Sequence, residues 1–240
     1  RKVRNIMTVV GGPNIIRDNL SFYVDAANID SYPGSGSTWT DLSGNGFGNA
    51  LFGATTYSTS PDKFDTNATD HLTADHLSLN ATITYADASA YTFEFVVKLR
   101  ASATATYQGL VGYGSTNPWL TLYANNTSGS SWDLRFRDNA AAYNTFSDIT
   151  DYNIQNNWAH IAIVVGTDRN MLFYLNGAWK QTKALTTSLC RVQRICGGYS
   201  SGGNYYSLQG SMALSRGYTS DLSATEILQN FNATKDRFSI

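Results

Sequence analysis

Residues 158–181 read WAHIAIVVGTDRNMLFYLNGAWKQ and carry the clearest folding signal in the chain. Ile161 and Ile163 alternate with less apolar neighbours, and this period of two indicates a β-strand that buries one face. Further apolar runs lie on both sides of Asn176-Gly177, the dipeptide that most strongly predicts a two-residue hairpin turn, because both turn positions need positive φ. The stretch therefore predicts two antiparallel strands joined at that turn.

The same pattern recurs along most of the chain. Short runs rich in Val, Ile, Tyr, Phe and Thr are separated by clusters of Gly, Asn, Asp and Ser, which is the signature of an antiparallel β-sandwich. In the run YTFEFVVKL, residues 91–99, we expect Phe93 and Phe95 to face the core and Glu94 and Lys98 to face solvent. The other expected strands are residues 20–26, 107–113, 119–124, 131–137, 158–166, 170–177, 190–198 and 205–218.

One helix is predicted near the end of the chain. Ser223 and Glu226 have the spacing of a capping box, in which each side chain binds a free backbone N–H of the first turn. Ile227, Leu228 and Phe231 then fall on one helical face. We expect this face to pack on the sandwich.

Composition limits the classes of function. The chain has 240 residues, 42% of them hydrophobic, which is enough for one large all-β domain. Its 17 basic and 18 acidic residues give a formal net charge of -1, and no basic stripe could neutralise a phosphate backbone, so we expect no nucleic-acid partner. No apolar run reaches the roughly 18 residues of a membrane span, so we expect no membrane partner and a soluble chain.

The two cysteines, Cys190 and Cys196, lie in one expected strand. Six residues of extended chain would separate them by about 20 Å, which is beyond disulfide reach. We therefore predict two free thiols on one face, with a disulfide across a tight bend as the alternative.

Four stretches of the chain, residues 20–53, 91–99, 157–181 and 210–238, resemble the concanavalin A-like, laminin-G-like jelly-roll domains and occur in that family's order. The closing stretch LSATEILQNFNATKDRF is similar to members found in bacteriophage and bacterial surface proteins. The resemblance implies two curved antiparallel sheets with the first and last strands close together. We accordingly expect an N-terminal arm at residues 1–19 and one all-β jelly-roll sandwich at residues 20–240, with a short C-terminal helix.

The segment DLSGNGFGN, residues 41–49, resembles the start of a calcium-binding loop. A complete loop of that kind needs a bidentate Glu at its twelfth position, where this chain has Phe52. We expect a tight turn in which the glycines supply positive φ, and no cofactor. Calcium at a sandwich rim, held by Asp133 or Asp138, is an alternative that the family resemblance implies.

Catalytic motifs are missing. Glycosidases of this general fold use paired carboxylates on one strand, but the chain has two glutamates, and Val96 stands two positions after Glu94. The second, Glu226, is assigned to the helix cap. His160 lies in an expected strand and is interpreted as a hydrogen-bonded structural residue. We predict that the protein is not an enzyme, with an all-Asp carboxylate pair left as an alternative.

Aromatic residues next to Asn, Asp and Arg are the best candidates for ligand binding, because an aromatic ring can stack on a sugar while its neighbours bind hydroxyl groups. Trp119 and Trp132 have a competing interpretation as core residues. The full set of candidate ligand-binding residues is Trp119, Tyr123, Asn125, Trp132, Arg135, Asp138, Tyr143, Tyr199 and Tyr205.

The resemblance and these candidates predict a non-enzymatic structural protein of a phage virion, either a capsid decoration or a tail-associated component. Its arm and loops would dock it to other virion proteins in an oligomer or larger assembly, and it would bind glycans as a second role. The alternatives are a carbohydrate-binding module of a bacterial surface or secreted protein and a polysaccharide-degrading glycosidase.

Overall fold

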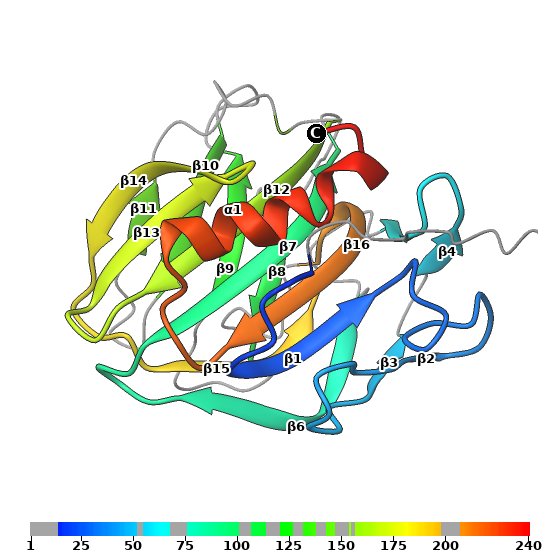
Figure 1. Ribbon diagram of the computed structural model, residues 1–240, viewed down its shortest axis with the longest axis horizontal. Helices are drawn as coiled ribbons and strands as arrows, with labels where there is room; N and C mark the ends of the chain where they lie inside the picture. The colour runs from blue at the N-terminus through cyan, green and yellow to red at the C-terminus, as the bar shows by residue number, and fades with distance from the viewer. Residues whose placement is uncertain are drawn as a thin grey trace, which may run out of the picture.

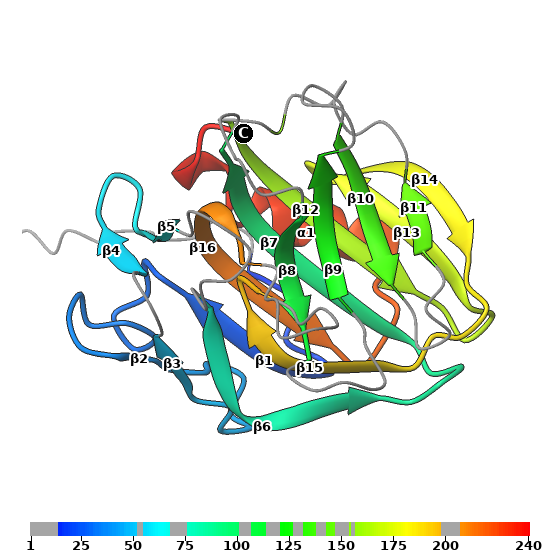
Figure 2. The same cartoon turned by 180° about the vertical axis from the view of Figure 1, so that it is seen from behind.

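The computed structural model describes residues 14–51, 55–67, 76–100, 107–113, 121–126, 132–137, 143–146, 154, 157–197 and 207–240. Its strands form two antiparallel sheets of eight strands each, which we call sheet A and sheet B, packed face to face (Figures 1 and 2). The predicted all-β jelly-roll sandwich is confirmed.

Sheet A contains the first and last strands. Its order is β14-β13-β12-β7-β16-β5-β4, and β1 pairs with β16, so the two ends of the sandwich lie side by side as the resemblance implied. The strands are β1 (Leu20–Asp25), β4 (Thr56–Ser58), β5 (Lys63–Asn67), β7 (Tyr91–Leu99), β12 (Trp158–Val165), β13 (Asn170–Leu175), β14 (Ala178–Ala184) and β16 (Gln209–Tyr218).

Sheet B forms the second layer, and Figure 2 shows it in front. Its order is β11-β10-β9-β8-β15-β6-β3-β2. The strands are β2 (Thr38–Trp39), β3 (Asn49–Leu51), β6 (Leu77–Tyr85), β8 (Tyr107–Gly112), β9 (Thr121–Asn126), β10 (Trp132–Arg137), β11 (Tyr143–Phe146) and β15 (Cys190–Ile195).

The main core lies between the sheets and follows the predicted alternation. Phe93, Phe95 and Val97 of β7 face it, as do Ile161 and Ile163 of β12. Burying one such side chain contributes about 1.5–3 kcal/mol. The core is also rich in paired aromatic rings, which are Phe22, Trp39, Phe64, Tyr85, Tyr91 and Phe173 among others.

The outer face of sheet A is covered as well, which the sequence pattern did not predict. Figure 1 shows helix α1 (Ala224–Asn232) lying across this face. Beneath it, Thr92 and Glu94 of β7 are fully buried, so the expectation of a solvent-facing Glu94 was wrong. A second apolar cluster seals the helix to the sheet through Tyr23, Ala162, Val164, Tyr174, Tyr218, Leu222 and Ile227.

Helix α1 begins with the predicted capping box. Ser223 Oγ accepts the backbone N–H of Glu226, and Glu226 Oε2 accepts the backbone N–H of Ser223 at 2.7 Å. Ile227 and Phe231 are buried as expected, but Leu228 is 46% exposed, so it does not share their packed face. A short 3-10 turn, η2 (Lys235–Arg237), follows the helix.

The predicted hairpin turn joins β13 to β14. Asn176 and Gly177 have φ of 50° and 74°, the left-handed values that this turn requires. A Cβ atom on Gly177 would lie 2.9 Å from Phe231 Cδ1 of α1. Glycine is therefore needed at this position for two reasons: the backbone has positive φ, and the helix approaches too closely for a side chain.

The prediction that Cys190 and Cys196 are free thiols is confirmed, and both are buried. The last residues of the expected arm pack on the sandwich. Ile15 and Ile16 touch the cluster beneath α1, and the backbone N–H of Ile16 donates to Asn230 Oδ1 at 2.8 Å. Residues 1–13 lie outside the described residues.

Candidate functional site

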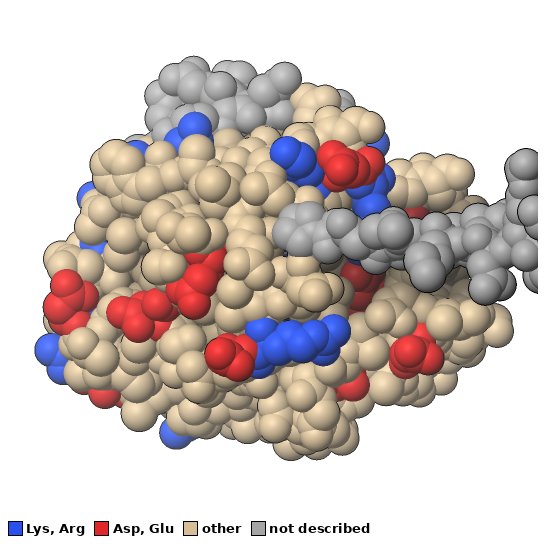
Figure 3. All heavy atoms as spheres, viewed as in Figure 1, with Lys and Arg blue, Asp and Glu red and all other residues tan. Residues whose placement is uncertain are grey.

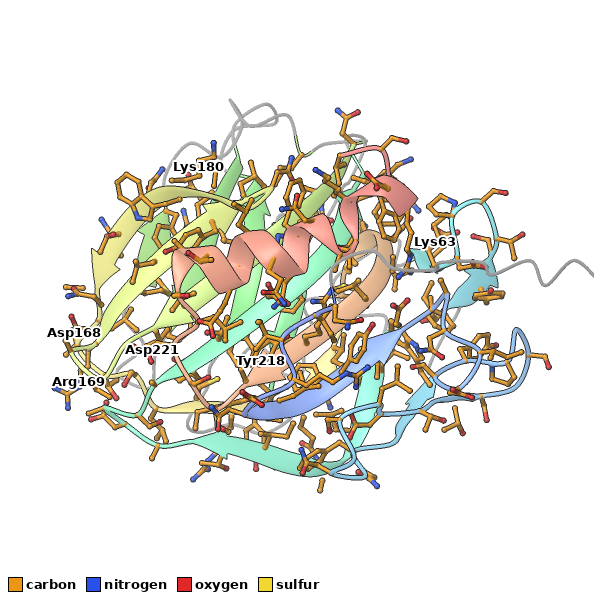
Figure 4. All side chains as sticks on the ribbon, viewed as in Figure 1. Lys63, Asp168, Arg169, Lys180, Tyr218 and Asp221 are labelled. Atoms are coloured by element: carbon orange, nitrogen blue, oxygen red, sulfur yellow. The ribbon has the colours of Figure 1, made fainter. Side chains whose placement is uncertain are left out.

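A cavity of about 510 Å³ opens where α1 begins, beside the turn between β12 and β13. Its lining residues come from two segments far apart in the sequence, residues 164–174 and 221–223. Figure 4 labels Asp168 and Asp221 on this side of the molecule, and Figure 3 shows acidic side chains gathered there, at the left of the view. We call this hollow the acidic cavity; its lining is Val164, Gly166, Thr167, Asp168, Leu172, Tyr174, Asp221, Leu222 and Ser223.

The rim of the acidic cavity carries two carboxylates. Asp168 accepts the backbone N–H of Asn170 at 2.9 Å and its side-chain amide at 2.6 Å, and these hydrogen bonds lower the pKa of Asp168. Asp221 is exposed and has no ion-pair partner among the described residues. The lowered pKa keeps Asp168 ionised at neutral pH, and the carboxylate oxygens of both residues can accept hydrogen bonds from hydroxyl groups.

The floor of the acidic cavity is apolar. Val164 and Leu172 face each other across β12 and β13, and Leu222 approaches from the segment before α1. Tyr174 is nearly buried, and this burial raises the pKa of its phenol, which therefore stays neutral. An apolar floor with a few polar acceptors at its rim suits a small ligand that has both carbon faces and hydroxyl groups.

The predicted aromatic site falls largely on β9, β10 and β11, which lie side by side in Figure 2. The register places Tyr123 opposite Arg135, and Tyr143 opposite Arg137. Asn125 is likewise opposite Asp133. These positions share one face of sheet B, so the topology brings together four of the predicted residues: Tyr123, Asn125, Arg135 and Tyr143.

Trp132 is the first residue of β10, and its side chain lies outside the described residues, so neither the binding nor the core interpretation of Trp132 is tested. Arg135 is half-buried and its guanidinium lies 3.2 Å from Asp133 Oδ2. Trp119, Asp138, Tyr199 and Tyr205 lie outside the described residues, as do the side chains of Tyr123, Asn125, Trp132 and Tyr143, so this predicted site stays a prediction.

The segment 41–49 forms a tight turn that is hydrogen-bonded to β1. Asp41 Oδ1 accepts the backbone N–H groups of Tyr23 and Ser43, both at 2.9 Å, and Oδ2 accepts that of Phe47 at 3.1 Å. Gly44 and Gly46 have φ of 90° and 76°. The glycines thus supply the positive φ that the turn interpretation predicted, and the Asp41 carboxylate in addition binds backbone N–H groups. The described residues also hold no group of three or more His, Cys, Asp or Glu side chains placed to bind a metal.

A network of buried polar groups lies beneath α1, and we call it the buried network: Glu94, His160, Arg216, Tyr218 and Asn230. Glu94 Oε2 accepts from Arg216 at 3.2 Å and from the Asn230 amide at 2.8 Å. Its Oε1 lies 3.3 Å from Nε2 of His160. Burial by itself lowers the pKa of Arg216, but the negative charge of Glu94 raises it more, so this guanidinium stays charged.

Both glutamates of the chain therefore have structural roles. Glu94 is fully buried in the buried network, and Glu226 completes the cap of α1. His160 is fully buried too, with its ring 5.7 Å from that of Phe231, in keeping with a structural role. Sequence reasoning missed the acidic cavity; its signals were the acidic turn at Asp168 and the acidic residue Asp221 just before the capping box.

Comparison with known proteins gives one family and a set of structural neighbours. The family model described as the concanavalin A-like lectin/glucanases superfamily matches residues 66–228. No curated protein sequence matches the chain significantly. No helix in the described part of the chain is long and apolar enough to cross a membrane.

Three solved structures illustrate the structural likeness. The binding domain of Paraclostridial Mosquitocidal Protein 1 is 16% identical with a TM-score of 0.61, over 90% of this chain and 52% of that chain. The binding domain of botulinum neurotoxin DC in complex with SialylT is 14% identical with a TM-score of 0.59, over 91% and 52%. Trypanosoma rangeli sialidase in complex with sialic acid is 14% identical with a TM-score of 0.59, over 91% and 33%.

These identities show a shared fold alone, and the chain spans about half or less of each neighbour's length. The family match is broader evidence, because it covers more than half of the chain and includes strands of both sheets. The two facing antiparallel sheets, the adjacent first and last strands and the family match agree. The chain belongs to the concanavalin A-like lectin/glucanases superfamily.

Proposed function

We propose that this chain is a non-enzymatic carbohydrate-binding domain that serves as a structural protein of a bacteriophage virion. The observation that supports binding is the acidic cavity, where an apolar floor meets two carboxylates. A sugar ring has apolar C–H faces and a rim of hydroxyl donors, so both of its surfaces find a partner there. The cavity volume of about 510 Å³ lies within the range of small-ligand sites.

The charge of the acidic cavity selects the kind of sugar. The carboxylates of Asp168 and Asp221 accept hydrogen bonds and disfavour a second negative charge, so they favour hydroxyl groups over a carboxylate or sulfate. We therefore propose neutral oligosaccharides as its ligands. Solved neighbours that are complexed with sialic acid or SialylT support glycan binding by this fold but do not identify the ligand of this chain.

The proposal that the domain is non-enzymatic rests on its glutamates. Hydrolysis of a glycosidic bond needs two carboxyl groups that reach the scissile bond from either side. Glu94 and Glu226 are both held by structural hydrogen bonds. A glycosidase that uses two aspartates is the competing function, and release of reducing ends from a polysaccharide would establish it.

Glycan binding is tested with the full chain on an array of neutral oligosaccharides, followed by calorimetric titration of the strongest binder. Asp221→Asn keeps the shape of the side chain but weakens its acceptor strength, and we expect a loss of affinity of about fivefold or more. Asp236→Asn is the matched control, because Asp236 lies in η2, outside the acidic cavity. Absence of neutral-sugar binding, or equal affinity of Asp221→Asn and the parent, would contradict the proposal.

The virion setting is supported by the resemblance of residues 222–238 to family members found in bacteriophage and bacterial surface proteins. Quantitative mass spectrometry of purified particles would find this chain in many copies if the proposal is correct, and would not find it if the chain belongs to a bacterial surface protein.

Docking through the arm is tested by deleting residues 1–13. This deletion spares Asn14 and Ile16, whose backbone groups bind Gln229 and Asn230 of the α1 helix. Full docking of the deleted chain would contradict a role for the arm.

A further inference from the structure

Trp179 is a large apolar side chain that the fold leaves open to solvent. It lies on β14, at the end of the strand order of sheet A, and is 56% exposed. Figure 1 shows β14 at the edge of the sheet, beyond β13. A single exposed apolar side chain is common on protein surfaces and does not by itself mark a site. What distinguishes Trp179 is its position next to the acidic cavity.

Strand register places Trp179 beside the floor of the acidic cavity. Trp179 is opposite Tyr174 of β13, and Thr182 is opposite Leu172. Tyr174 and Leu172 both line the acidic cavity, on the face of sheet A that carries α1. Residues directly opposite each other on antiparallel strands share a face, with Cβ atoms about 5 Å apart. Trp179 and Thr182 therefore continue the cavity floor by one strand.

A β-bulge brings both residues to this face. Residues two positions apart share a face in a regular strand, so Trp179 and Thr182, three positions apart, would otherwise lie on opposite faces. The register skips Lys180, so β14 has one residue more than β13 at this point. Bulges of this kind redirect side chains at sheet edges and beside binding sites. The local backbone is thus built to place Trp179 and Thr182 together.

Trp179 and Thr182 offer both kinds of contact that a neutral sugar needs. The indole N–H of Trp179 donates to Thr182 Oγ1 at 3.2 Å, and this hydrogen bond restrains the ring. A ring that is already restrained loses little freedom when a ligand packs on it. The Thr182 hydroxyl is exposed and, besides accepting this bond, can donate its own proton. The ring can therefore stack on the C–H face of a sugar while the hydroxyl binds a sugar hydroxyl.

Helix α1 borders the same surface with a second exposed apolar side chain. A Cβ atom on Gly177 would lie 3.1 Å from Leu228 Cδ1, so Leu228 touches the turn that leads into β14. Trp179 follows two positions after Gly177. Leu228 and Trp179 are two of the three large apolar side chains that the described part of the chain exposes. These two lie at one turn beside one cavity and are not scattered over the surface.

The distance across this surface sets the length of the ligand. The backbone N–H of Leu222 donates to Thr92 Oγ1 of β7 at 3.0 Å, so the neighbouring Asp221 lies over β7. Strands β12 and β13 separate β7 from β14. Three strand spacings, on the order of 14 Å, therefore lie between Asp221 and Trp179. An oligosaccharide spans this distance, and a monosaccharide does not.

We propose that Trp179 is the stacking platform of a second subsite, which binds a further sugar residue of a neutral oligosaccharide whose first residue occupies the acidic cavity. This inference rests on the function proposed above for the acidic cavity. Thr182 positions the ring and binds the same sugar residue. The chain accordingly selects oligosaccharides over monosaccharides.

The test uses the full chain, the neutral tetrasaccharide that binds most strongly on the array and the monosaccharide from which it is built. Affinities come from nuclear magnetic resonance titration, because the monosaccharide binds weakly. Trp179→Ala should bind the tetrasaccharide at least about tenfold more weakly than the parent, since truncation removes an aromatic anchor. Its affinity for the monosaccharide should be unchanged. Trp179→Phe keeps a ring and should keep most of the affinity.

A spectroscopic signature locates the contact. The indole N–H signal of Trp179 is identified by its absence from the spectrum of Trp179→Phe. This signal should shift when the tetrasaccharide is added to the parent and should stay in place when the monosaccharide is added.

Two further substitutions test the role of Thr182 and the specificity of the effect. Thr182→Val removes the hydroxyl and should weaken tetrasaccharide binding about threefold, whereas Thr182→Ser keeps the hydroxyl and should bind like the parent. Ile29→Ala is the matched control, because Ile29 is another exposed apolar residue but lines a different hollow. It should leave both affinities unchanged. Thermal melting confirms that each variant folds.

Failure of this inference differs from failure of the proposed function. Equal tetrasaccharide affinity of Trp179→Ala and the parent, together with a loss in Asp221→Asn, would overturn the second subsite and keep the acidic cavity. Absence of binding by every neutral sugar would contradict both. A change in oligomeric state of Trp179→Ala, measured by light scattering with the sugar affinity unchanged, would overturn the subsite and assign the ring to a contact between copies of the chain.

Discussion

Glu94 and Lys98 stand four residues apart on one strand, β7, and on the same face of sheet A, yet they have opposite environments. Glu94 is fully buried beneath α1 and its carboxylate is bound by Arg216 and Asn230. Lys98 is half-buried at the wall of a small hollow on sheet A, which Lys63, Asp65 and Ser211 also line. What separates them is whether the chain itself covers the charge. Charges that the fold covers must be paired for stability, and charges that it leaves at a cavity are available to a ligand.

The largest effect should come from removing the carboxylate of the buried network. Glu94→Ala leaves the Arg216 guanidinium buried without its counter-charge, so we expect a loss of about 3–5 kcal/mol in the free energy of unfolding. Urea unfolding followed by fluorescence measures it. Lys98→Ala, on the same strand and face, should cost less than about 1 kcal/mol. Equal costs of the two substitutions would remove the distinction between covered and open charges.

The next largest effect tests how closely helix α1 packs over sheet A. Gly177→Ala places a methyl group against Phe231 of α1 and strains a backbone with φ of 74°, so we expect a loss of about 2–3 kcal/mol. Gly44→Ala has a similar positive φ, but no atom lies within 4 Å of its added Cβ. It should cost only about 1 kcal/mol. If both variants melt alike, then the close approach of the helix does not contribute.

A smaller effect concerns pH. Burial by itself raises the pKa of Asp25. The Arg237 guanidinium, which donates to the two Asp25 carboxylate oxygens at 2.6 and 2.7 Å, has the larger opposite effect, so the pKa of Asp25 lies below its ordinary value of 3.8. The unfolded chain therefore takes up the proton first as the pH falls. Stability from this pair is complete above about pH 4 and is lost as the pH falls toward the lowered pKa.

Asp25→Asn tests this linkage. At neutral pH we expect it to cost about 1–2 kcal/mol, because one charged hydrogen-bonded pair is lost. Melting temperatures recorded between pH 7 and pH 2.5 should show the difference between Asp25→Asn and the parent shrinking below pH 4. Asp30→Asn, at an exposed position, is the control. A difference that stays constant over this range would show that the Asp25 carboxylate is not stabilised by folding.

The smallest effect on stability belongs to the open cavities. Asp221→Asn and Lys98→Gln should each change the free energy of unfolding by less than about 0.5 kcal/mol, since neither group is buried in an ion pair of the described residues. Thermal melting checks this. A loss above 1 kcal/mol would mean that these charges stabilise the fold, as Glu94 does.

The sequence predicted the parts of the fold that depend on local pattern. The alternation in β7 and β12, the turn at Asn176-Gly177 and the cap at Ser223 and Glu226 are each encoded within a few residues, and each is present in the structure. The burial of Glu94 could not be predicted from local sequence. It depends on α1, which begins 130 residues later and packs over the strand.

The cavities were missed for the same reason. Asp168 and Asp221 are 53 positions apart, and Lys98 and Asp65 meet only through the order of β7, β16 and β5 in sheet A. The acidic cavity forms where the turn between β12 and β13 meets the segment before α1, and the hollow at Lys98 forms through the order of the strands, so composition predicts neither of them. Tyr123, Arg135 and Tyr143 lie on the neighbouring strands β9, β10 and β11, but the binding site predicted there stays a prediction.

The most direct test of the account is a paired titration. The Asp221→Asn and Lys98→Gln variants are each titrated with the neutral oligosaccharide selected on the array, next to the parent chain. The account predicts that Asp221→Asn loses affinity and that Lys98→Gln keeps it, with both melting temperatures unchanged. Equal affinity of Asp221→Asn and the parent, or an equal loss in both variants, would contradict the assignment of ligand binding to the acidic cavity.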